Sequence, residues 1–129
     1  MFVNISNHPS VKWSPAQIAA AGEPIIDVQF PAVSPELDEN KLLDFVCNWA
    51  DEVLYPILPP RDFGGDCKLV RPVTAHLMGE TGFCALLAEK LRNMGAVIVH
   101  STTAREVVEH PDGSKTAQFR FVRFRRTGF

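Results

Sequence analysis

The sequence predicts an α/β fold of three layers, in which helices cover both faces of a parallel central sheet. Apolar runs of strand length alternate with helix-forming segments along most of the chain, as in parallel sheets with helical connections. After the fourth run, two segments of alternating residues, 105–109 and 116–125, flank the pair Asp112-Gly113, which favours a β-hairpin. We therefore expect β-α-β-α-β-α-β followed by a C-terminal β-hairpin.

The four strands of the parallel sheet are predicted where apolar residues run together: 2–5, 25–30, 73–78 and 97–99. Because connections between parallel strands are right-handed, we expect the spatial order second, first, third, fourth, with the hairpin extending one edge. The order then reverses between the first and third strands. Ligands of open α/β sheets bind at such a point, outside the carboxyl ends of the strands.

The three helices are predicted from end signals and apolar spacing. Ser14 can cap a first helix that runs to residue 21, with Pro15 in its first turn and Gly22 after its end. Apolar residues at steps of three and four predict a second helix over 38–55 and a third over 83–94.

Length and charge limit the class of protein. A chain of 129 residues is expected to form one domain, residues 1–129. Its net charge of −2 argues against binding of long nucleic acid, although residues 1–60 sum to −6 and residues 61–129 to +4. In residues 115–126, arginines alternate with aromatic residues. This pattern favours an edge strand or dimer seam over a stacking surface for nucleic acid.

The sequence lacks signals for metals, cofactors or membranes. Cys47, Cys67 and Cys84 lie far apart, without CxxC or Cys/His spacing, so we expect no metal site. Neither a P-loop nor GxGxxG occurs, and we expect no cofactor. With no secretory signal and no apolar run near the ~20 residues that span a bilayer, we expect a cytoplasmic protein without a membrane segment.

Residues 56–72 are the stretch least typical of a compact α/β domain. They contain four prolines and the turn Gly64-Gly65-Asp66. Loops longer than ~12–15 residues without regular structure are usually functional or disordered. We expect this Pro-rich loop to be an ordered lid, an arm or a partner contact.

The richest polar segment follows the first strand and contains Asn7, His8, Ser10, Lys12 and Trp13. An imidazole titrates near neutrality, and an ammonium can pair with a phosphate. As alternatives, Ser10 is a turn residue, Lys12 a solvated cation and Trp13 a core residue. Because so many polar groups crowd a loop at the expected switch point, we predict that at least two of them bind a ligand.

A second polar segment, Gly79, Glu80, Thr81 and Gly82, leads from the third strand into the third helix. Glycines permit close backbone approach, and a helix N-terminus offers N–H groups to an anion. Alternatively, Thr81 only caps the helix. Glu80 would repel a phosphate unless it binds a sugar hydroxyl or acts as a base.

A third polar segment begins where the fourth strand is expected to end. Ser101, Thr102, Thr103 and Arg105 carry hydroxyls and a guanidinium that suit phosphate or ribose contacts. The alternative is a turn before the hairpin. His76, inside an apolar run, is interpreted as a satisfied core histidine.

These segments resemble small proteins encoded near CRISPR loci. The resemblance rests on the opening Asn-Ile-Ser-Asn-His-Pro-Ser-x-x-Trp-Ser, the Gly-Glu-Thr loop before a helix, and the ending Phe-Arg-Phe-Val-Arg-Phe-Arg. The chain is similar to CARF-type (CRISPR-associated Rossmann fold) sensors and small ring nucleases over most of residues 1–82 and 100–126. The Pro-rich loop is not covered.

The resemblance implies a Rossmann-like homodimer that holds a cyclic oligoadenylate across its two-fold axis, in type III CRISPR antiviral signalling. Ring nucleases cleave this ligand without a metal, by aligning a ribose 2′-hydroxyl with the adjacent phosphate. The implied general acid or base is His8, and Lys12 would stabilise the phosphorane charge. Residues implied in binding are Asn7, Ser10, Trp13, Gly79, Glu80, Thr81, Gly82, Thr102, Thr103 and Arg105.

Three other functions stay open on the sequence. The protein could bind the nucleotide without cleaving it, as a sensor. It could be an enzyme that uses the same crevice for a mononucleotide or a sugar phosphate. It could also be a partner-binding module that uses the Pro-rich loop and the Phe/Arg strand.

Overall fold

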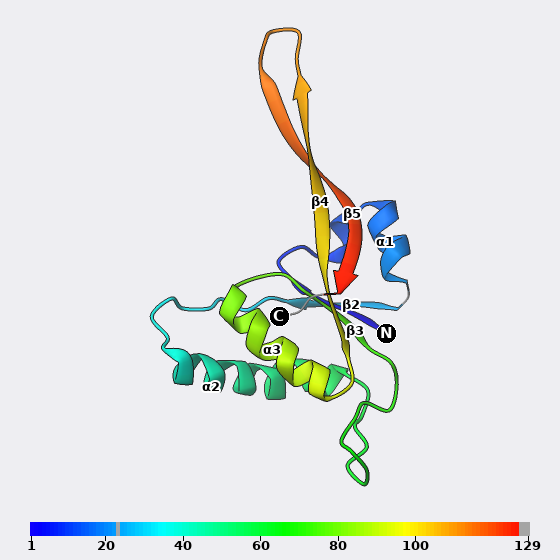
Figure 1. Ribbon diagram of the computed structural model, residues 1–129, viewed down its shortest axis with the longest axis vertical. Coiled ribbons are helices and arrows are strands. Elements are labelled where there is room, and N and C mark those ends of the chain that lie inside the picture. Colours follow the sequence, from blue (N-terminus) through cyan, green and yellow to red (C-terminus); the bar gives the residue numbers. More distant parts are fainter. Residues whose placement is uncertain (23, 127–129) are drawn as a thin grey trace.

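A computed structural model describes residues 1–22 and 24–126 of the chain (Figure 1). Its sheet has the order β2-β1-β3-β4-β5. β1 is parallel to β2 and β3, β3 is parallel to β4, and β4 and β5 are antiparallel. The predicted α/β fold and strand order are therefore confirmed. The strands are β1 (Phe2–Ser6), β2 (Ile25–Gln29), β3 (Thr74–Leu77), β4 (Val97–Glu109) and β5 (Lys115–Arg126).

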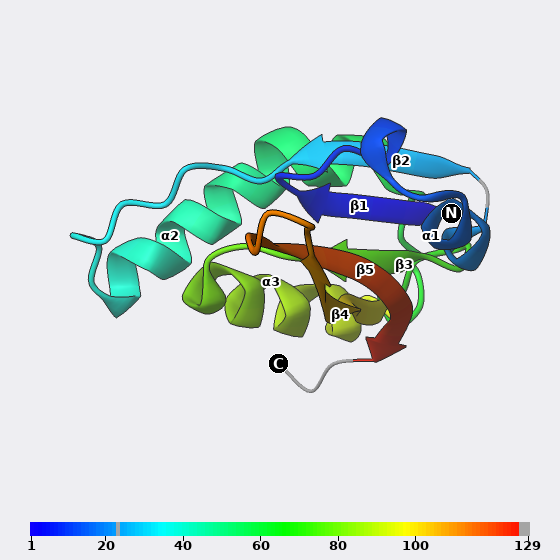
Figure 2. The ribbon, with the colours of Figure 1, turned by 90° about the horizontal axis from the view of Figure 1, so that it is seen from above.

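The helices α1 (Pro15–Ala21), α2 (Glu39–Trp49) and α3 (Thr81–Asn93) form the outer layers. Figure 1 shows α2 and α3 on one side of the sheet and α1 on the other. The larger apolar core lies on the α2–α3 side and includes Phe83. A smaller one, built on Phe2, Trp13 and Val99, lies on the α1 side. Figure 2 shows the arrowheads of β1, β2 and β3 pointing the same way, so their carboxyl ends share one edge.

Two predicted helix boundaries are wrong. The predicted helix over 38–55 is α2 followed by a π-helical turn, Ala50–Leu54, and a 3₁₀ turn, Tyr55–Ile57. Pro56 lacks an N–H and clashes with the preceding turn, so an α-helix does not continue there. α3 begins at Thr81 rather than at residue 83, with Glu80 and not Thr81 as its cap.

The predicted break after the fourth strand is also wrong. β4 runs through residues 100–104 without interruption, and its pairing with β5 extends from Val99 to Glu109. Thr102 and Thr103 are β-branched, a residue type that fits strands, and they pair with β5 instead of turning. Figure 1 shows the resulting hairpin projecting well beyond the other strands.

The Pro-rich loop is ordered through backbone bonds. Arg61 and Leu69 form an isolated β-bridge, and the Asp62 N–H donates to the Lys68 carbonyl at 2.8 Å. The Leu69 N–H donates to the carbonyl of Met94 at 2.8 Å, which ties the loop to the end of α3. The loop thus forms a small ribbon at the end of the molecule away from the hairpin tip (Figure 1).

Candidate functional site

A cavity of about 240 Å³ lies on the α1 face of the sheet, near the carboxyl ends of β1 and β3. The segment after β1, the end of β3 and both strands of the hairpin enclose it. We call it the α1-face cavity. It is lined by His8, Lys12, Trp13, Gln17, His76, Met78, Ser101, Thr103, Phe119 and Phe121.

The segment after β1 is folded around the backbone carbonyl of His8. This oxygen accepts hydrogen bonds from Nδ2 of Asn4 at 2.9 Å and from Nε1 of Trp13 at 3.0 Å. The His8 N–H in turn donates to Oγ of Ser6 at 3.1 Å. Because these bonds use only the backbone of His8, its exposed imidazole is left to line the cavity.

A chain of hydrogen bonds crosses the sheet beneath the cavity. Nδ2 of Asn4 donates to Oδ1 of Asp27 at 2.8 Å, and Oδ1 of Asn4 lies 2.8 Å from Nδ1 of His76. Nε2 of His76 lies 3.2 Å from Oγ of Ser101. We call these four residues the polar network. It links β2, β1, β3 and β4 in that order and ends at the cavity.

The chemistry of the acceptors fixes the direction of every bond in the polar network. The Asp27 carboxylate and the His8 carbonyl only accept, so Asn4 presents its NH₂ to them and its oxygen to His76. Nδ1 of His76 must then carry the proton and donate. Nε2 is left as an acceptor, and the hydroxyl of Ser101 donates to it.

Burial sets the protonation state of His76. The side chain is only 2 % exposed, and burial, together with the smaller effects of His100 and His8, lowers its pKa to about 4. The imidazole is therefore neutral at pH 7. Asp27 is held ionised: partial burial raises its pKa, but hydrogen bonds from Asn4 and Ser10 outweigh this effect, so the pKa lies below its ordinary value.

Aromatic rings form the apolar wall around His76. Trp13 meets its imidazole edge-on, with centroids 5.6 Å apart, and Phe124 does so at 5.2 Å. Phe2 packs on all three rings. Trp13 is thus largely a core residue, one edge of which reaches the cavity.

A β-bulge in β5 extends this row of aromatic rings along the hairpin. Along β4 the partner changes from Arg123 at Thr102 to Phe121 at Thr103, so Val122 has no partner. The extra residue turns Phe121 and Phe124, three positions apart, to the same face, with ring centroids 4.9 Å apart. Phe119 continues the row toward the hairpin tip and is 71 % exposed.

Of the residues predicted for the site, the structure brings His8, Lys12, Trp13 and Thr103 together at the α1-face cavity. Two neighbours in the same segment are engaged elsewhere. Asn7 accepts a hydrogen bond from Nε2 of Gln29 at 2.6 Å. Ser10 donates through both its N–H (3.0 Å) and its hydroxyl (2.8 Å) to the Asp27 carboxylate, and thereby anchors the segment to β2.

The segment of Gly79, Glu80, Thr81 and Gly82 does not line the α1-face cavity. A Cβ at Gly79 would lie 2.3 Å from ring atoms of Phe30, so core packing alone requires glycine there. The carboxylate of Glu80 accepts from the N–H of Gly82 at 3.1 Å and of Phe83 at 2.6 Å. The helix N–H groups expected to receive an anion are therefore bound by this side chain.

The hydroxyl residues of β4 are divided between the two faces of the hairpin. Thr103 faces the α1-face cavity. Thr102 points away from it and donates to the carbonyl of Arg123 at 3.1 Å. Arg105 is exposed and pairs directly with Phe119, which places it on the cavity side but beyond the lining residues.

Sequence reasoning missed the polar network behind the cavity. It predicts Ser101 as part of a segment that suits phosphate or ribose contacts, but it interprets His76 only as a core residue and does not join the two. The signal was present: Asn4 and His76 are polar side chains inside strands expected to be buried. Buried polar groups need partners, so these two were candidates for one shared network.

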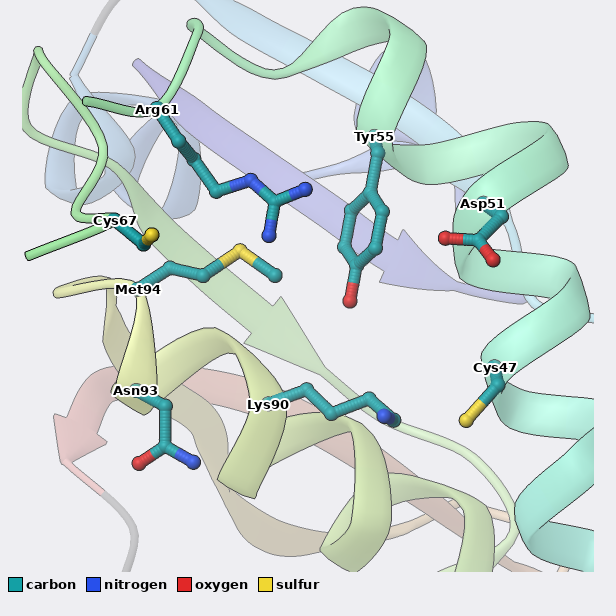
Figure 3. A pocket seen from close by; sticks show the side chains of 8 residues that line it. All are labelled: Cys47, Asp51, Tyr55, Arg61, Cys67, Lys90, Asn93 and Met94. Atoms are coloured by element: carbon teal, nitrogen blue, oxygen red, sulfur yellow. The ribbon is translucent and has the colours of Figure 1, made fainter. Parts of the chain in front are cut away.

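A larger cavity, of about 420 Å³, lies between α2, α3 and the Pro-rich loop (Figure 3). We call it the α2–α3 cavity. A hydrogen bond with Cys47 raises the pKa of Lys90, and burial raises that of Tyr55. The guanidinium of Arg61 lies 5.2 Å from the ring centroid of Tyr55. The cavity is lined by Cys47, Asp51, Tyr55, Arg61, Cys67, Lys90, Asn93 and Met94.

Among residues 1–22 and 24–126, which the structure describes, no three His, Cys, Asp or Glu side chains are grouped so that they could hold a metal ion. In the same part of the chain, no helix is long and apolar enough to cross a membrane.

One known protein family matches nearly the whole chain. The model of the uncharacterized protein MJ1673 family matches residues 1–125. The chain belongs to this family. No curated protein and no solved structure matches it.

Proposed function

We propose that this protein binds a cyclic oligoadenylate at the α1-face cavity and cleaves it without a metal, as a ring nuclease of type III CRISPR antiviral signalling. The observation that carries the proposal is the convergence of three kinds of group in one cavity. Lys12 and His8 suit phosphates, the hydroxyls of Ser101 and Thr103 suit riboses, and the exposed ring of Phe119 suits a base. The likeness to CARF-type proteins supports this choice of ligand.

The size of the cavity favours a dimer. Its volume of about 240 Å³ is below the ~300–1,000 Å³ of most small-molecule sites, and a cyclic oligonucleotide is larger than most small molecules. A two-fold copy would add a second half-site. β5 is an edge strand, and the hairpin exposes Val107, Val108 and Val122 on its two faces, apolar surface that pairing with a second copy would partly cover.

The test is a calorimetric titration with cyclic tetra-adenylate in the presence of EDTA, with product analysis by chromatography and the mass by sedimentation. We expect one ring bound per dimer and conversion to linear product. Binding of the ring without formation of linear product would indicate a sensor and not a nuclease. A failure of the ring to bind would refute the proposal.

A second candidate, an enzyme or binding protein for a mononucleotide, is favoured by the same small volume. It predicts a monomer that binds adenosine monophosphate at least as tightly as the ring. The same titration and sedimentation runs decide between the two.

A further inference from the structure

Ser101 stands at the end of the polar network, where the network meets the α1-face cavity. Its hydroxyl proton is committed to Nε2 of His76, because Asn4 and Asp27 fix the imidazole with its proton on Nδ1. The lone pairs of Ser101 Oγ therefore remain to accept a hydrogen bond. Since the serine is half-buried and lines the cavity, a ligand can reach this oxygen.

His76 itself is almost closed to a ligand, with 2 % of its surface exposed. The order of groups from the cavity inward is hydroxyl, neutral imidazole, amide oxygen, carboxylate. This is the order of a hydroxyl, a base and a group that orients the base in nucleophilic and proton-transfer sites. Here the orienting amide is itself held by Asp27 at 2.8 Å.

We propose that Ser101 accepts a hydrogen bond from a ribose 2′-hydroxyl of the ligand and, with His76 behind it, takes the proton of that hydroxyl at the start of cleavage. The inference rests on the proposed function, because it assumes a ribonucleotide ligand in the α1-face cavity. It adds recognition of ribose over deoxyribose, and it makes Ser101 a catalytic residue and His76 and Asn4 positioning residues.

The step balances with groups that line the cavity. The 2′-hydroxyl gives its proton to Ser101 Oγ as the serine proton moves to Nε2 of His76. The 2′-oxygen forms a bond to the adjacent phosphorus, and the P–O5′ bond breaks with its electron pair on the 5′-oxygen. That oxygen takes a proton from His8. The products are a 2′,3′-cyclic phosphate and a free 5′-hydroxyl. His76 then gives its proton to solvent and His8 takes one from solvent, so both imidazoles return to their starting states.

A bound phosphate would aid this transfer. The charged or titratable groups around His76 are His8 and Lys12 from the cavity side, His100 on the adjacent strand, and Asp27 through Asn4. A ligand phosphate held in the α1-face cavity near His8 and Lys12 offsets the effect of the two neighbouring histidines on His76 and favours its protonated form. His76 is thus a better base with the ligand than without it.

The experiment compares Ser101→Ala, Ser101→Thr and, as a matched control, Thr116→Ala in the full chain. Thr116 on β5 is also a hydroxyl residue bonded to a histidine, with its Oγ1 2.6 Å from Nε2 of His110, but it lies outside the α1-face cavity. Single-turnover cleavage of cyclic tetra-adenylate is measured beside its affinity, the affinity of the all-2′-deoxy ring, and the thermal midpoint.

We expect Ser101→Ala to lose at least ~10²-fold in cleavage rate, as for removal of a general acid–base group. Its affinity for the ribo ring should fall to that for the deoxy ring, while its thermal midpoint stays near wild type. Ser101→Thr should restore most of the rate, and Thr116→Ala should cleave normally.

If Ser101→Ala cleaved the ring at the wild-type rate, the inference would be overturned and the proposed function would still stand. Equal loss in Ser101→Ala and Thr116→Ala would also overturn it. A wild-type protein that binds no ring would refute the proposed function, and the inference with it.

Discussion

The α1-face cavity and the α2–α3 cavity differ in how their polar groups are held. In the smaller, α1-face cavity, Ser101 and His76 are fixed by a chain of hydrogen bonds that ends on Asp27. In the larger one, the cations are long side chains: Arg61 lies over Tyr55 and Phe63, and Lys90 pairs with Cys47 (Figure 3).

This difference shows that volume alone does not identify a site. The α2–α3 cavity offers about 420 Å³ against about 240 Å³. A ligand there must first order flexible side chains, which costs conformational entropy. In the α1-face cavity, hydrogen bonds already hold Ser101 and His76 in place before a ligand binds, so binding there carries less of this entropy cost.

The largest effect we expect is on cleavage, from His8→Ala. This variant removes the proposed proton donor but keeps the backbone carbonyl that holds Asn4 and Trp13. Cleavage should fall by about 10²-fold or more with little loss of affinity, measured by single turnover and calorimetry. His110→Ala, at the hairpin tip, is the control and should cleave normally. Unchanged turnover in His8→Ala would remove His8 from the chemistry.

The second effect concerns how the free energy of unfolding depends on pH. The pKa of the His76 side chain is about 4 in the folded state and near 6.5 in the unfolded state. At pH values between these two, the unfolded chain therefore binds a proton on His76 that the folded chain does not. Stability is unaffected above pH 6.5 and falls as pH drops toward 4, by about 2–3 kcal/mol between pH 7.5 and 4.5.

Urea unfolding of wild type and His76→Gln at pH 7.5 and 4.5 measures this contribution of His76. The glutamine variant is less stable at pH 7.5 but should show a smaller loss on acidification. Asp27, whose pKa is also lowered, adds a loss only nearer pH 4, and it is common to both proteins. An equal loss in both proteins would show that His76 is not held neutral.

A third effect separates the two cavities directly. Phe119→Ala removes the exposed ring at the rim of the α1-face cavity and should weaken binding of cyclic tetra-adenylate about tenfold, in line with ~1–3 kcal/mol per stacked base. Tyr55→Ala, in the α2–α3 cavity, should leave affinity unchanged. The reverse pattern would move the site to the larger cavity.

The smallest effect concerns the segment that the sequence placed in the site. Glu80→Ala removes the cap of α3 and should cost about 1 kcal/mol of stability in thermal unfolding. Glu80→Gln keeps an acceptor oxygen and should cost less. Neither should change affinity for the ring, and a large change would return Glu80 to the ligand site.

The fold could be predicted from the sequence because its signals are local. Apolar runs, the Ser14-Pro15 cap and Asp112-Gly113 each act over a few residues and agree with one topology. The continuation of β4 through residues 100–104 could not be predicted in this way, because Thr102 and Thr103 are stabilised by partners on β5 that local signals do not reveal.

The site was predicted only in part, for a related reason. His8 and Lys12 stand out because they cluster along the chain, whereas Asn4, His76 and Ser101 are brought together only by strand pairing. The parallel register sets Asn4 opposite His76, an adjacency that follows from strand order and register together. Glu80 was misleading because a carboxylate before a helix can cap it as well as serve a ligand.

The most direct test is imidazole ¹⁵N NMR of the protein titrated with cyclic tetra-adenylate. The account predicts that His76 is protonated on Nδ1 alone before addition, and that the signals of His8 and His76 shift as the ring binds, while those of His110 do not. Saturable binding that leaves the signals of both His8 and His76 in place would contradict it.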